Sequence, residues 1–354
     1  MKNVMIIVPY MSGYGGTETV IKNLFMENSR KKQNIMNFKL VSVGGYRDNN
    51  WISDIPNKEI IQFYGGKKLR KLQYMVFLPF IMFFKIKKYN PDTIISTNPI
   101  IWTLAFFYKK ILKGKYQVFS WYHYSLKDKP LKSIFLKKAD KFLAISSGIK
   151  RQLIAKGIPE DNIKLVYNPI LRKKGTIERT EGKNTIKLAY IGRIMLDGQK
   201  NMRQLVDALT QVSVDWKLDV YGEGDIELFR KYISKKKINK NIQIHGFKKN
   251  VWSEFKKMDA IVLTSKYEGL PMVLNEAISM GIPVVSSNCE TGPDDIINRN
   301  NGLIYNLEST ADLVRCLNLM ALKKNNFKNI MQIKESINKF YSDVFFNNFL
   351  RSMR

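Results

Sequence analysis

The chain has 354 residues, of which 45% are hydrophobic and 12% aromatic. This is enough apolar material for two packed domains of ordinary size, and it excludes a largely disordered chain. The net charge is +29, and residues 1–172 contribute +20 of it through 30 basic and 10 acidic side chains. An anionic partner is therefore expected for the N-terminal half, either a membrane or a nucleic acid, although a lysine bias of the genome would produce the same excess.

Cysteine content and hydropathy indicate the compartment. The two cysteines, Cys289 and Cys316, offer neither a disulfide framework nor a metal-ligand spacing, which favours a reducing environment. No run approaches the roughly 20 apolar residues of a spanning helix. The opening MKNVMIIVPYMSG is typical of a buried strand entering a glycine turn rather than of a signal peptide. We expect a cytoplasmic protein that is peripheral at the inner face of the cell membrane.

Apolar runs alternate with helical patterns along residues 1–170. Strands are predicted over 4–8, 38–43, 60–63, 93–96, 117–121, 140–145 and 163–166, and helices over 19–28, 67–90, 101–112 and 129–138, with one more beginning near Ser146. This alternation is typical of a parallel, doubly wound α/β sheet, whose ligands bind beyond the carboxyl ends of the strands.

Two features stand at that edge of the predicted first sheet. Gly15 and Gly16, in the loop SGYGGTET, would let backbone N–H groups approach a ligand closely. His123 follows the strand predicted over 117–121. Each has an ordinary structural explanation as well, since a glycine pair marks many tight turns and a lone histidine is more often structural.

Residues 67–90, KKLRKLQYMVFLPFIMFFKIKKYN, combine an apolar middle with basic ends. Such a helix is suited to the interface of an anionic bilayer. A core helix of the first domain with basic ends explains the same pattern. The two interpretations are compatible, because a helix has two faces.

The pattern restarts after a polar segment over 171–184, which is predicted to be a linker. Strands are predicted over 186–191, 216–221, 243–246, 260–263 and from 283, with helices over 202–210, 248–257, 272–280, 309–322, 326–338 and in the C-terminal FYSDVFFNNFLRSM. Two α/β domains are therefore expected, over 1–170 and 171–338, followed by a terminal segment over 339–354.

The most informative stretch is LTSKYEGLPMVLNEAISMGIPVVSS, residues 263–287. Pro271 is predicted at the first helical position, and the N–H groups at this helix start would bind a diphosphate. The residues expected there are Gly269, Leu270, Pro271, Met272 and Val273. Glu276, one turn deeper, would accept hydrogen bonds from a ribose diol, and Glu268 would face what lies beyond the phosphates. Two solvated acids on a surface helix are the ordinary alternative.

The full arrangement S-x-x-E-G-L-P-x-x-x-x-E-A-x-x-x-G-x-P-V-V resembles the E-x7-E signature of family 4 glycosyltransferases. The resemblance implies the GT-B fold of that family, in which two Rossmann-like domains with parallel sheets face each other across a cleft. It implies that residues 1–170 bind the acceptor, that residues 171–338 bind the nucleotide sugar, and that the segment 339–354 packs back on the first domain.

The resemblance also implies roles for single residues. Arg193 and Lys200, in GRIMLDGQKN, match the basic residues that contact the donor diphosphate, a pair suited to binding phosphate without a metal. Glu268 and His123 would lie near the donor sugar. The other residues implied at the donor are in turns: Gly16, Gly192, Gly222, Glu223, Gly246 and Phe247. Within the family, DGQKN, W-x-L-x-x-Y-G-E-G and S-x-x-x-x-G-P-x-D-I-I are similar to lipopolysaccharide 1,6-galactosyltransferases.

The expected activity is transfer of a hexose from UDP-galactose or UDP-glucose, with retention, to a glycan or lipid-linked acceptor in polysaccharide or lipopolysaccharide biosynthesis. No Asp-x-Asp motif stands at a strand end, so neither a metal nor another cofactor is expected. An anionic membrane surface is an expected partner. Nucleic acid is not, because no recognisable binding module interleaves basic and aromatic residues. The alternatives are a related GT-B enzyme with a small soluble acceptor, and a basic membrane- or nucleic-acid-binding protein without catalysis.

Overall fold

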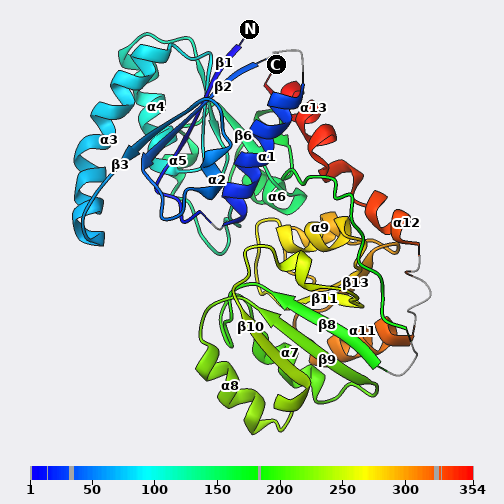
Figure 1. Ribbon diagram of the computed structural model, residues 1–354. Coiled ribbons are helices and arrows are strands. Elements are labelled where there is room, and N and C mark those ends of the chain that lie inside the picture. Colours follow the sequence, from blue (N-terminus) through cyan, green and yellow to red (C-terminus); the bar gives the residue numbers. More distant parts are fainter. Residues whose placement is uncertain are drawn as a thin grey trace. The chain divides into compact units, whose positions relative to one another are not determined.

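The computed structural model describes residues 2–13, 15–31, 36–181, 185–322, 327 and 329–353. The chain divides into two compact units (Figure 1). The first unit comprises Met1–Pro169 together with Ser342–Arg354, and the second comprises Ile170–Tyr341.

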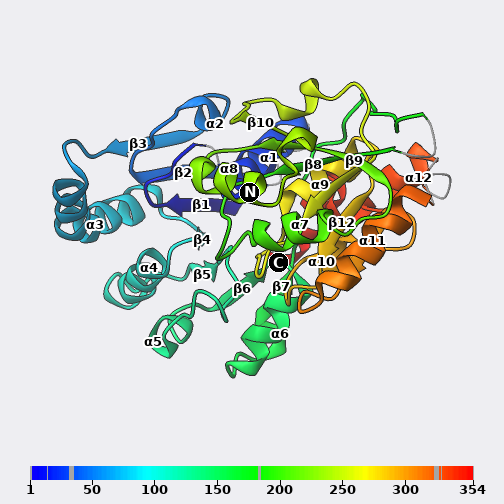
Figure 2. The same cartoon turned by 90° about the horizontal axis from the view of Figure 1, so that it is seen from below.

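The first unit is a parallel sheet of seven strands in the order β3-β2-β1-β4-β5-β6-β7. Its strands are β1 (Lys2–Val8), β2 (Met36–Gly44), β3 (Lys58–Gln62), β4 (Thr93–Ser96), β5 (Gln117–Ser120), β6 (Lys141–Ala144) and β7 (Ile163–Leu165). Its helices are α1 (Gly16–Arg30), α2 (Asn50–Ser53), α3 (Lys67–Tyr89), α4 (Pro99–Ile111), α5 (Ser133–Leu136), α6 (Ser147–Ala155) and α13 (Ser342–Ser352). Figure 2 shows α3, α4 and α5 on one side of the sheet.

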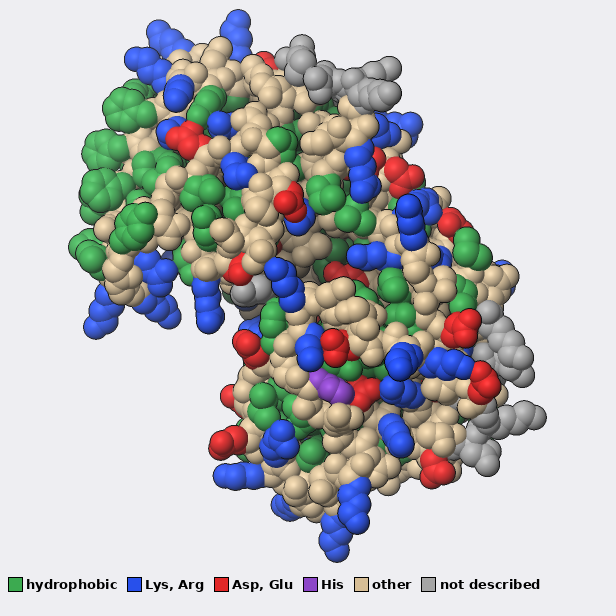
Figure 3. Space-filling view, in the orientation of Figure 1, with side chains coloured by type: hydrophobic (Ala, Val, Ile, Leu, Met, Phe, Trp, Pro, Cys, Tyr) green, Lys and Arg blue, Asp and Glu red, His purple; other side chains and the backbone are tan. Residues whose placement is uncertain are grey.

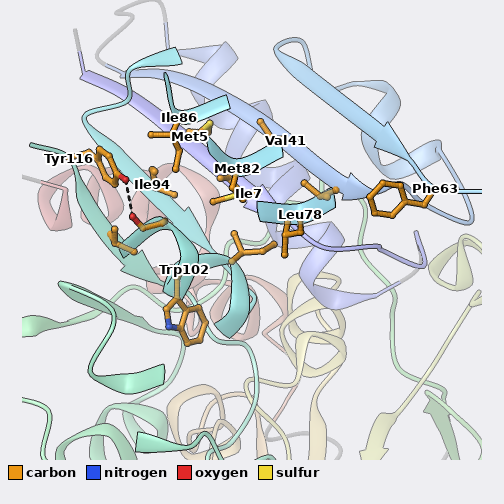
Figure 4. Packing of buried hydrophobic residues seen from close by; sticks show 14 residues of the cluster. Met5, Ile7, Val41, Phe63, Leu78, Met82, Ile86, Ile94, Trp102 and Tyr116 are labelled. Atoms are coloured by element: carbon orange, nitrogen blue, oxygen red, sulfur yellow. Dashed lines mark hydrogen bonds between the residues drawn. The ribbon is translucent and has the colours of Figure 1, made fainter. Parts of the chain in front are cut away.

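One face of this sheet is covered by α3 and α4 (Figure 4). Leu78, Met82 and Ile86 of α3 recur every four residues, so one stripe of this long helix is buried against the strands. On α4, Ala105 accepts a hydrogen bond of 2.8 Å at its carbonyl from the hydroxyl of Tyr116, which satisfies both groups within the core.

The C-terminal helix α13 contacts α1. The contact is aromatic: the ring of Phe38 on β2 lies 5.8 Å from that of Phe25, 6.4 Å from Phe346 and 6.2 Å from Phe349. Apolar contacts of this kind bury large areas. The aromatic spacing in the last helix therefore stabilises the unit that begins the chain.

The second unit is a parallel sheet of six strands in the order β10-β9-β8-β11-β12-β13. Its strands are β8 (Thr185–Ile191), β9 (Asp215–Tyr221), β10 (Ile242–Gly246), β11 (Ala260–Leu263), β12 (Val284–Ser287) and β13 (Gly302–Tyr305). Its helices are α7 (Met202–Leu209), α8 (Ile226–Lys235), α9 (Met272–Ser279), α10 (Pro293–Ile296), α11 (Thr310–Leu322) and α12 (Ile330–Glu335). The prediction of two parallel α/β sheets is confirmed.

Several predicted elements differ in detail. Only a 3-10 turn, Val251–Glu254, forms where a helix over 248–257 was predicted. The described part of 326–338 contains α12 and a 3-10 turn; residues 326 and 328 lie outside the described chain. Part of the predicted linker is fixed to the second sheet, because the N–H and hydroxyl of Thr180 donate to buried Asp259 at 3.0 and 2.6 Å. Within the described chain, no helix is long and apolar enough to span a bilayer.

Candidate active site

The loops that follow β8, β9 and β10 meet at the carboxyl edge of the second sheet. The N–H of Gly192 donates to the carbonyl of Tyr221 at 3.0 Å, and that of Gly222 donates to Gly246 at 2.9 Å. A β-carbon on Gly222 would lie 1.8 Å from the Gly192 oxygen, so only glycine permits this approach. Three of the predicted turn glycines therefore hold one another in place.

Arg193 is held at this edge with its guanidinium exposed. Its carbonyl accepts a 2.7 Å hydrogen bond from the hydroxyl of buried Tyr190. The guanidinium donates to Gln199 Oε1 at 2.6 Å, and Gln199 Nε2 donates to the carbonyl of Tyr267 at 3.1 Å. The other N–H groups of the guanidinium can donate to an oxyanion.

Lys200 is fixed against the loop that follows β11. Its carbonyl accepts a 2.9 Å hydrogen bond from the Thr264 hydroxyl, and the neighbouring carbonyl of Gln199 accepts one of 2.8 Å from the Lys266 N–H. The ammonium forms an ion pair of 2.6 Å with Glu268, and the two side chains are only 13% and 12% exposed. The fold thus brings together two residues that are 68 positions apart in the sequence.

Helix α9 begins four residues after Glu268. The structure places Pro271 at the N-cap and Met272 as the first helical residue, one position later than predicted. Among the described residues, no acceptor takes the N–H of Met272 or Val273, as is usual for a helix start. Such N–H groups favour an anion.

A second loop supports this helix start from behind. The hydroxyl of Thr291 donates to the carbonyl of Glu268. A β-carbon on Gly292, whose φ is +104°, would lie 2.6 Å from Pro271 Cδ and 3.0 Å from Leu270 Cα. The contact therefore requires glycine at 292 and fixes the backbone of the Gly269–Pro271 turn.

Glu276 lies on α9 one turn beyond this start. Its Oε2 accepts a 3.3 Å hydrogen bond from Trp252 Nε1, and burial raises the pKa of its carboxyl. The carboxylate therefore has one oxygen held by an indole, while its other oxygen remains to accept from a ligand. The pair of acids that the spacing singled out thus has two different surroundings: Glu268 faces a cation and Glu276 an indole.

The remaining candidates of this unit are more exposed. Glu223 and Phe247 are exposed, and Gly246 is half-buried. His245 stacks on Tyr221 with ring centroids 4.4 Å apart and hydrogen-bonds Asp219 at 2.9 Å, which supports a structural role. In the part of the chain that the structure describes, no group of three or more His, Cys, Asp or Glu side chains is arranged to bind a metal ion.

The first unit contains Gly16 and His123. Gly16 is the first residue of α1 and not a loop residue as predicted, because Gly15 is the N-cap. Buried Glu18 accepts hydrogen bonds of 3.0 Å from the Ser12 hydroxyl and the Gly13 N–H, so the acid stabilises this loop from inside.

His123 lies in the segment after β5, with its ring 5.0 Å from that of Trp121. Its Nε2 atom is enclosed and has no hydrogen-bond partner among the described residues. Burial lowers the pKa of the imidazole to about 3, so the ring is neutral near pH 7. A neutral imidazole with a free nitrogen is suited to a hydroxyl partner.

Sequence reasoning missed the residues that hold the predicted ones. Gln199 positions Arg193, Trp252 positions Glu276, and Thr291 positions the backbone of Glu268. Gln199 could have been predicted from the sequence, since it immediately precedes Lys200 in the loop GRIMLDGQKN. No local pattern distinguishes Trp252 or Thr291, because both act on residues 23 or more positions away.

Two family models match the chain. One is described as Glycosyltransferase Family 4 and matches residues 14–171, and the other, Glycosyl transferases group 1, matches residues 174–342. Together they account for both units.

Relatives match over nearly the full length. The chain is 32% identical over 344 residues to a lipopolysaccharide 1,6-galactosyltransferase of Escherichia coli (strain K12), covering 95% of this chain and 94% of the relative. It is 32% identical over 347 residues to the enzyme of the same name from Salmonella typhimurium (strain LT2), covering 96% and 95%. The solved apo structure of the lipopolysaccharide outer core galactosyltransferase WaaB superposes with a TM-score of 0.85 at 30% identity, covering 99% of each chain.

Proposed function

The chain belongs to family 4 of the glycosyltransferases, and we propose that it transfers a hexose from a UDP-sugar, UDP-galactose or UDP-glucose, with retention at the anomeric carbon. The proposed acceptor is a glycan or lipid-linked saccharide of lipopolysaccharide or another cell-surface polysaccharide. Full-length similarity to lipopolysaccharide galactosyltransferases supports this choice.

The observation that carries the proposal is the meeting of Lys200, Glu268 and the start of α9. During transfer, the bond between the anomeric carbon and the diphosphate breaks, and its electron pair stays on the phosphate oxygen. The acceptor hydroxyl forms the new bond to that carbon, and its proton passes to an oxygen of the departing diphosphate. Lys200, Arg193 and the N–H groups of α9 would stabilise the growing phosphate charge more strongly in the transition state than in the donor.

Donor recognition follows from the two acids. Glu276 would accept from both hydroxyls of the ribose, since a carboxylate has free lone pairs beside its indole partner. When the donor phosphate pairs with Lys200, the carboxylate of Glu268 would be released from this ion pair and would accept a hydrogen bond from a hydroxyl of the transferred hexose. No divalent metal is proposed, because fixed cations and helix N–H groups supply the positive charge that a metal would otherwise supply.

His123 is proposed as a group that contacts substrate from the first unit. Its neutral ring and partnerless Nε2 suit a hydrogen bond to a sugar hydroxyl. His123→Asn, which retains a polar side chain, is expected to preserve more activity than His123→Ala.

An anionic membrane surface is the proposed location of the acceptor. Outside its buried stripe, α3 exposes Leu69, Leu72, Met75, Val76, Phe77, Phe80 and Phe84. Figure 3 shows hydrophobic side chains gathered over α3, with basic side chains near both of its ends. An apolar stripe with flanking lysines is the pattern of an interfacial helix, and we propose that the enzyme works at the inner face of the cell membrane.

The test is a panel of UDP-, GDP- and ADP-hexoses with EDTA present, read by thermal shift and by slow donor hydrolysis. Stabilisation and cleavage with a single UDP-hexose are expected. Cleavage that requires added Mg²⁺ or Mn²⁺ would contradict the metal-free mechanism. No response to any nucleotide sugar would contradict the proposed function.

A further inference from the structure

The first unit contains a pocket of its own at the carboxyl edge of its sheet. Its volume is about 350 Å³, and it is lined by the segments that follow β1, β3 and β4 and by the first two turns of α3. Ligand sites occupy about 300–1,000 Å³, so this pocket has room for one small group rather than an oligosaccharide. None of the residues predicted from the sequence as site residues lines it.

The wall of the pocket is mostly apolar and partly aromatic. Tyr10, Phe63 and Tyr74 contribute rings, and those of Phe63 and Tyr74 meet edge to face at 6.4 Å. Gly44 also lines the pocket; its φ is +103°, and a β-carbon there would lie 3.3 Å from Tyr10 Cβ. Aromatic walls of this kind accept the C–H face of a pyranose ring.

Three cations line the same pocket: Lys67, Arg70 and Lys71, from the start of α3. Among the described residues, none of the three forms an ion pair, whereas Lys85 farther along α3 pairs with Glu59. The guanidinium of Arg70 lies over the ring of Tyr10, 5.0 Å from its centroid, which orients this cation at the pocket. Three positive charges without acidic partners among the described residues favour an anionic ligand at this pocket.

Tyr74, one of the residues that line the pocket, carries a buried polar group without a partner among the described residues. The hydroxyl of Tyr74 is enclosed and makes no hydrogen bond among the described residues. Burial raises the pKa of this phenol, so it is neutral and able to donate near pH 7. Burial has removed the hydrogen bonds that this hydroxyl would make to water, and the protein supplies no acceptor in their place among the described residues. A ligand oxygen beside it would supply that acceptor.

We propose that this pocket binds the phosphorylated saccharide end of an acceptor, with the sugar face on the aromatic rings and the phosphate between Lys67, Arg70 and Lys71. The inference rests on the proposed glycosyltransferase function and adds the chemical class of its acceptor. The adjoining exposed face of α3 would then bring the rest of a lipid-linked acceptor to the membrane surface. The phosphate belongs either to the saccharide or to a lipid headgroup, and the test separates these two sources.

The experiment titrates the full chain with glucose 6-phosphate and with glucose, followed by saturation-transfer NMR, in the presence of saturating UDP. UDP occupies the proposed donor site, so phosphate binding at Arg193 and Lys200 does not contribute. We expect glucose 6-phosphate to bind and glucose to bind at least about 10-fold more weakly. Arg70→Gln and the double variant Lys67→Gln/Lys71→Gln are expected to weaken glucose 6-phosphate by about 10- to 100-fold, the effect of losing a charged hydrogen bond.

Matched controls come from the same helix. Lys68→Gln removes a charge from the same turn but not from the pocket lining, and Lys87→Gln/Lys88→Gln removes two charges from the far end of α3. Both are expected to bind glucose 6-phosphate as the unaltered chain does. Tyr74→Phe keeps the ring and removes the partnerless hydroxyl, and it is expected to weaken phosphate binding with an unchanged melting temperature.

Two results would overturn the inference. One is that glucose and glucose 6-phosphate bind equally well, or that the control variants weaken glucose 6-phosphate binding as much as the pocket variants do. The other is that the chain binds phosphatidylglycerol vesicles more strongly than phosphatidylcholine vesicles but does not bind glucose 6-phosphate. If Lys67→Gln/Lys71→Gln and Lys87→Gln/Lys88→Gln weakened this vesicle binding equally, the cations would be assigned to the membrane surface. Failure of the proposed function is distinct, because it would show as absence of UDP binding by the unaltered chain whatever happens at this pocket.

Discussion

The two units share one architecture but differ at the edge where their ligands are expected. In the second unit, backbone hydrogen bonds join the loops after β8, β9 and β10, and the charged side chains there are paired or held, as in Lys200 with Glu268. In the first unit, an apolar pocket is lined by three cations of α3 that form no ion pair among the described residues. In both units the parallel sheet determines where a ligand can bind, namely at the carboxyl ends of its strands. The side chains at that edge determine which ligand binds there.

The largest difference between the units is expected in catalysis. Lys200→Ala should lower turnover by about 100-fold or more, because a fixed cation at the leaving phosphate is lost. Steady-state kinetics with a UDP-hexose measure this. Lys266→Ala is the control: it removes an exposed cation two residues from Glu268 while keeping the backbone N–H that binds Gln199. Turnover of Lys200→Ala close to that of the control would remove Lys200 from the mechanism.

Arg193→Ala is expected to lower turnover by a similar factor of about 100, with little change in the melting temperature because the side chain is exposed. Gln199→Ala should have a smaller effect in the same direction, since it releases the guanidinium but leaves the charge. If Gln199→Ala were as damaging as Arg193→Ala, Gln199 itself would contact the donor.

Donor affinity should depend on Glu276. Glu276→Ala is expected to weaken UDP binding by about 10- to 100-fold, because two hydrogen bonds to a charged acceptor are lost. Calorimetric titration with UDP measures the change. Glu254→Ala, at an exposed acid in the same segment as Trp252, provides the control. A fall in turnover at unchanged UDP affinity would mean that Glu276 acts on the sugar and not on the ribose.

Membrane affinity should belong to the first unit alone. Phe80 and Phe84 of α3 are each 63% exposed, and replacing both by Ser should weaken binding to phosphatidylglycerol vesicles by about 10-fold or more through lost apolar burial. Co-sedimentation measures the bound fraction. The control is Leu228→Ser/Met331→Ser, which removes two exposed apolar residues from the second unit. Equal losses in the two double variants would mean that no unit is specialised for the membrane.

The smallest expected effect concerns stability. Burial raises the pKa of Glu276, so the folded chain binds this proton more tightly than the unfolded chain, and the free energy of unfolding falls as pH rises through the folded pKa. Glu276→Gln removes this penalty and can still accept from Trp252. Without UDP it should melt slightly higher than the unaltered chain at pH 7 and equally at low pH. Calorimetric scans test this, and a lower melting temperature at pH 7 would contradict it.

Much of this could be predicted from local patterns. Apolar runs of strand length, separated by helical periodicity, indicated both parallel sheets, because each buried strand must be apolar on both faces. Glu268 and Glu276 were visible because the start of a helix and the position one turn later are defined by spacing along the chain. The helix predicted over 248–257 is instead a 3-10 turn over Val251–Glu254, whose Trp252 binds Glu276, a residue that no pattern within 248–257 could indicate.

The sequence by itself determined the alternation of strands and helices, the glycine turns after β8 and β9 and the family of the chain, since all of these depend on residues close together along it. Only the tertiary structure decided which residues meet. Lys200 pairs with a carboxylate 68 residues away, Thr180 with one 79 residues away, and α3 buries one stripe while exposing another. The pocket in the first unit belongs to the same class, because it is formed by the ends of separate strands that only the sheet order brings together.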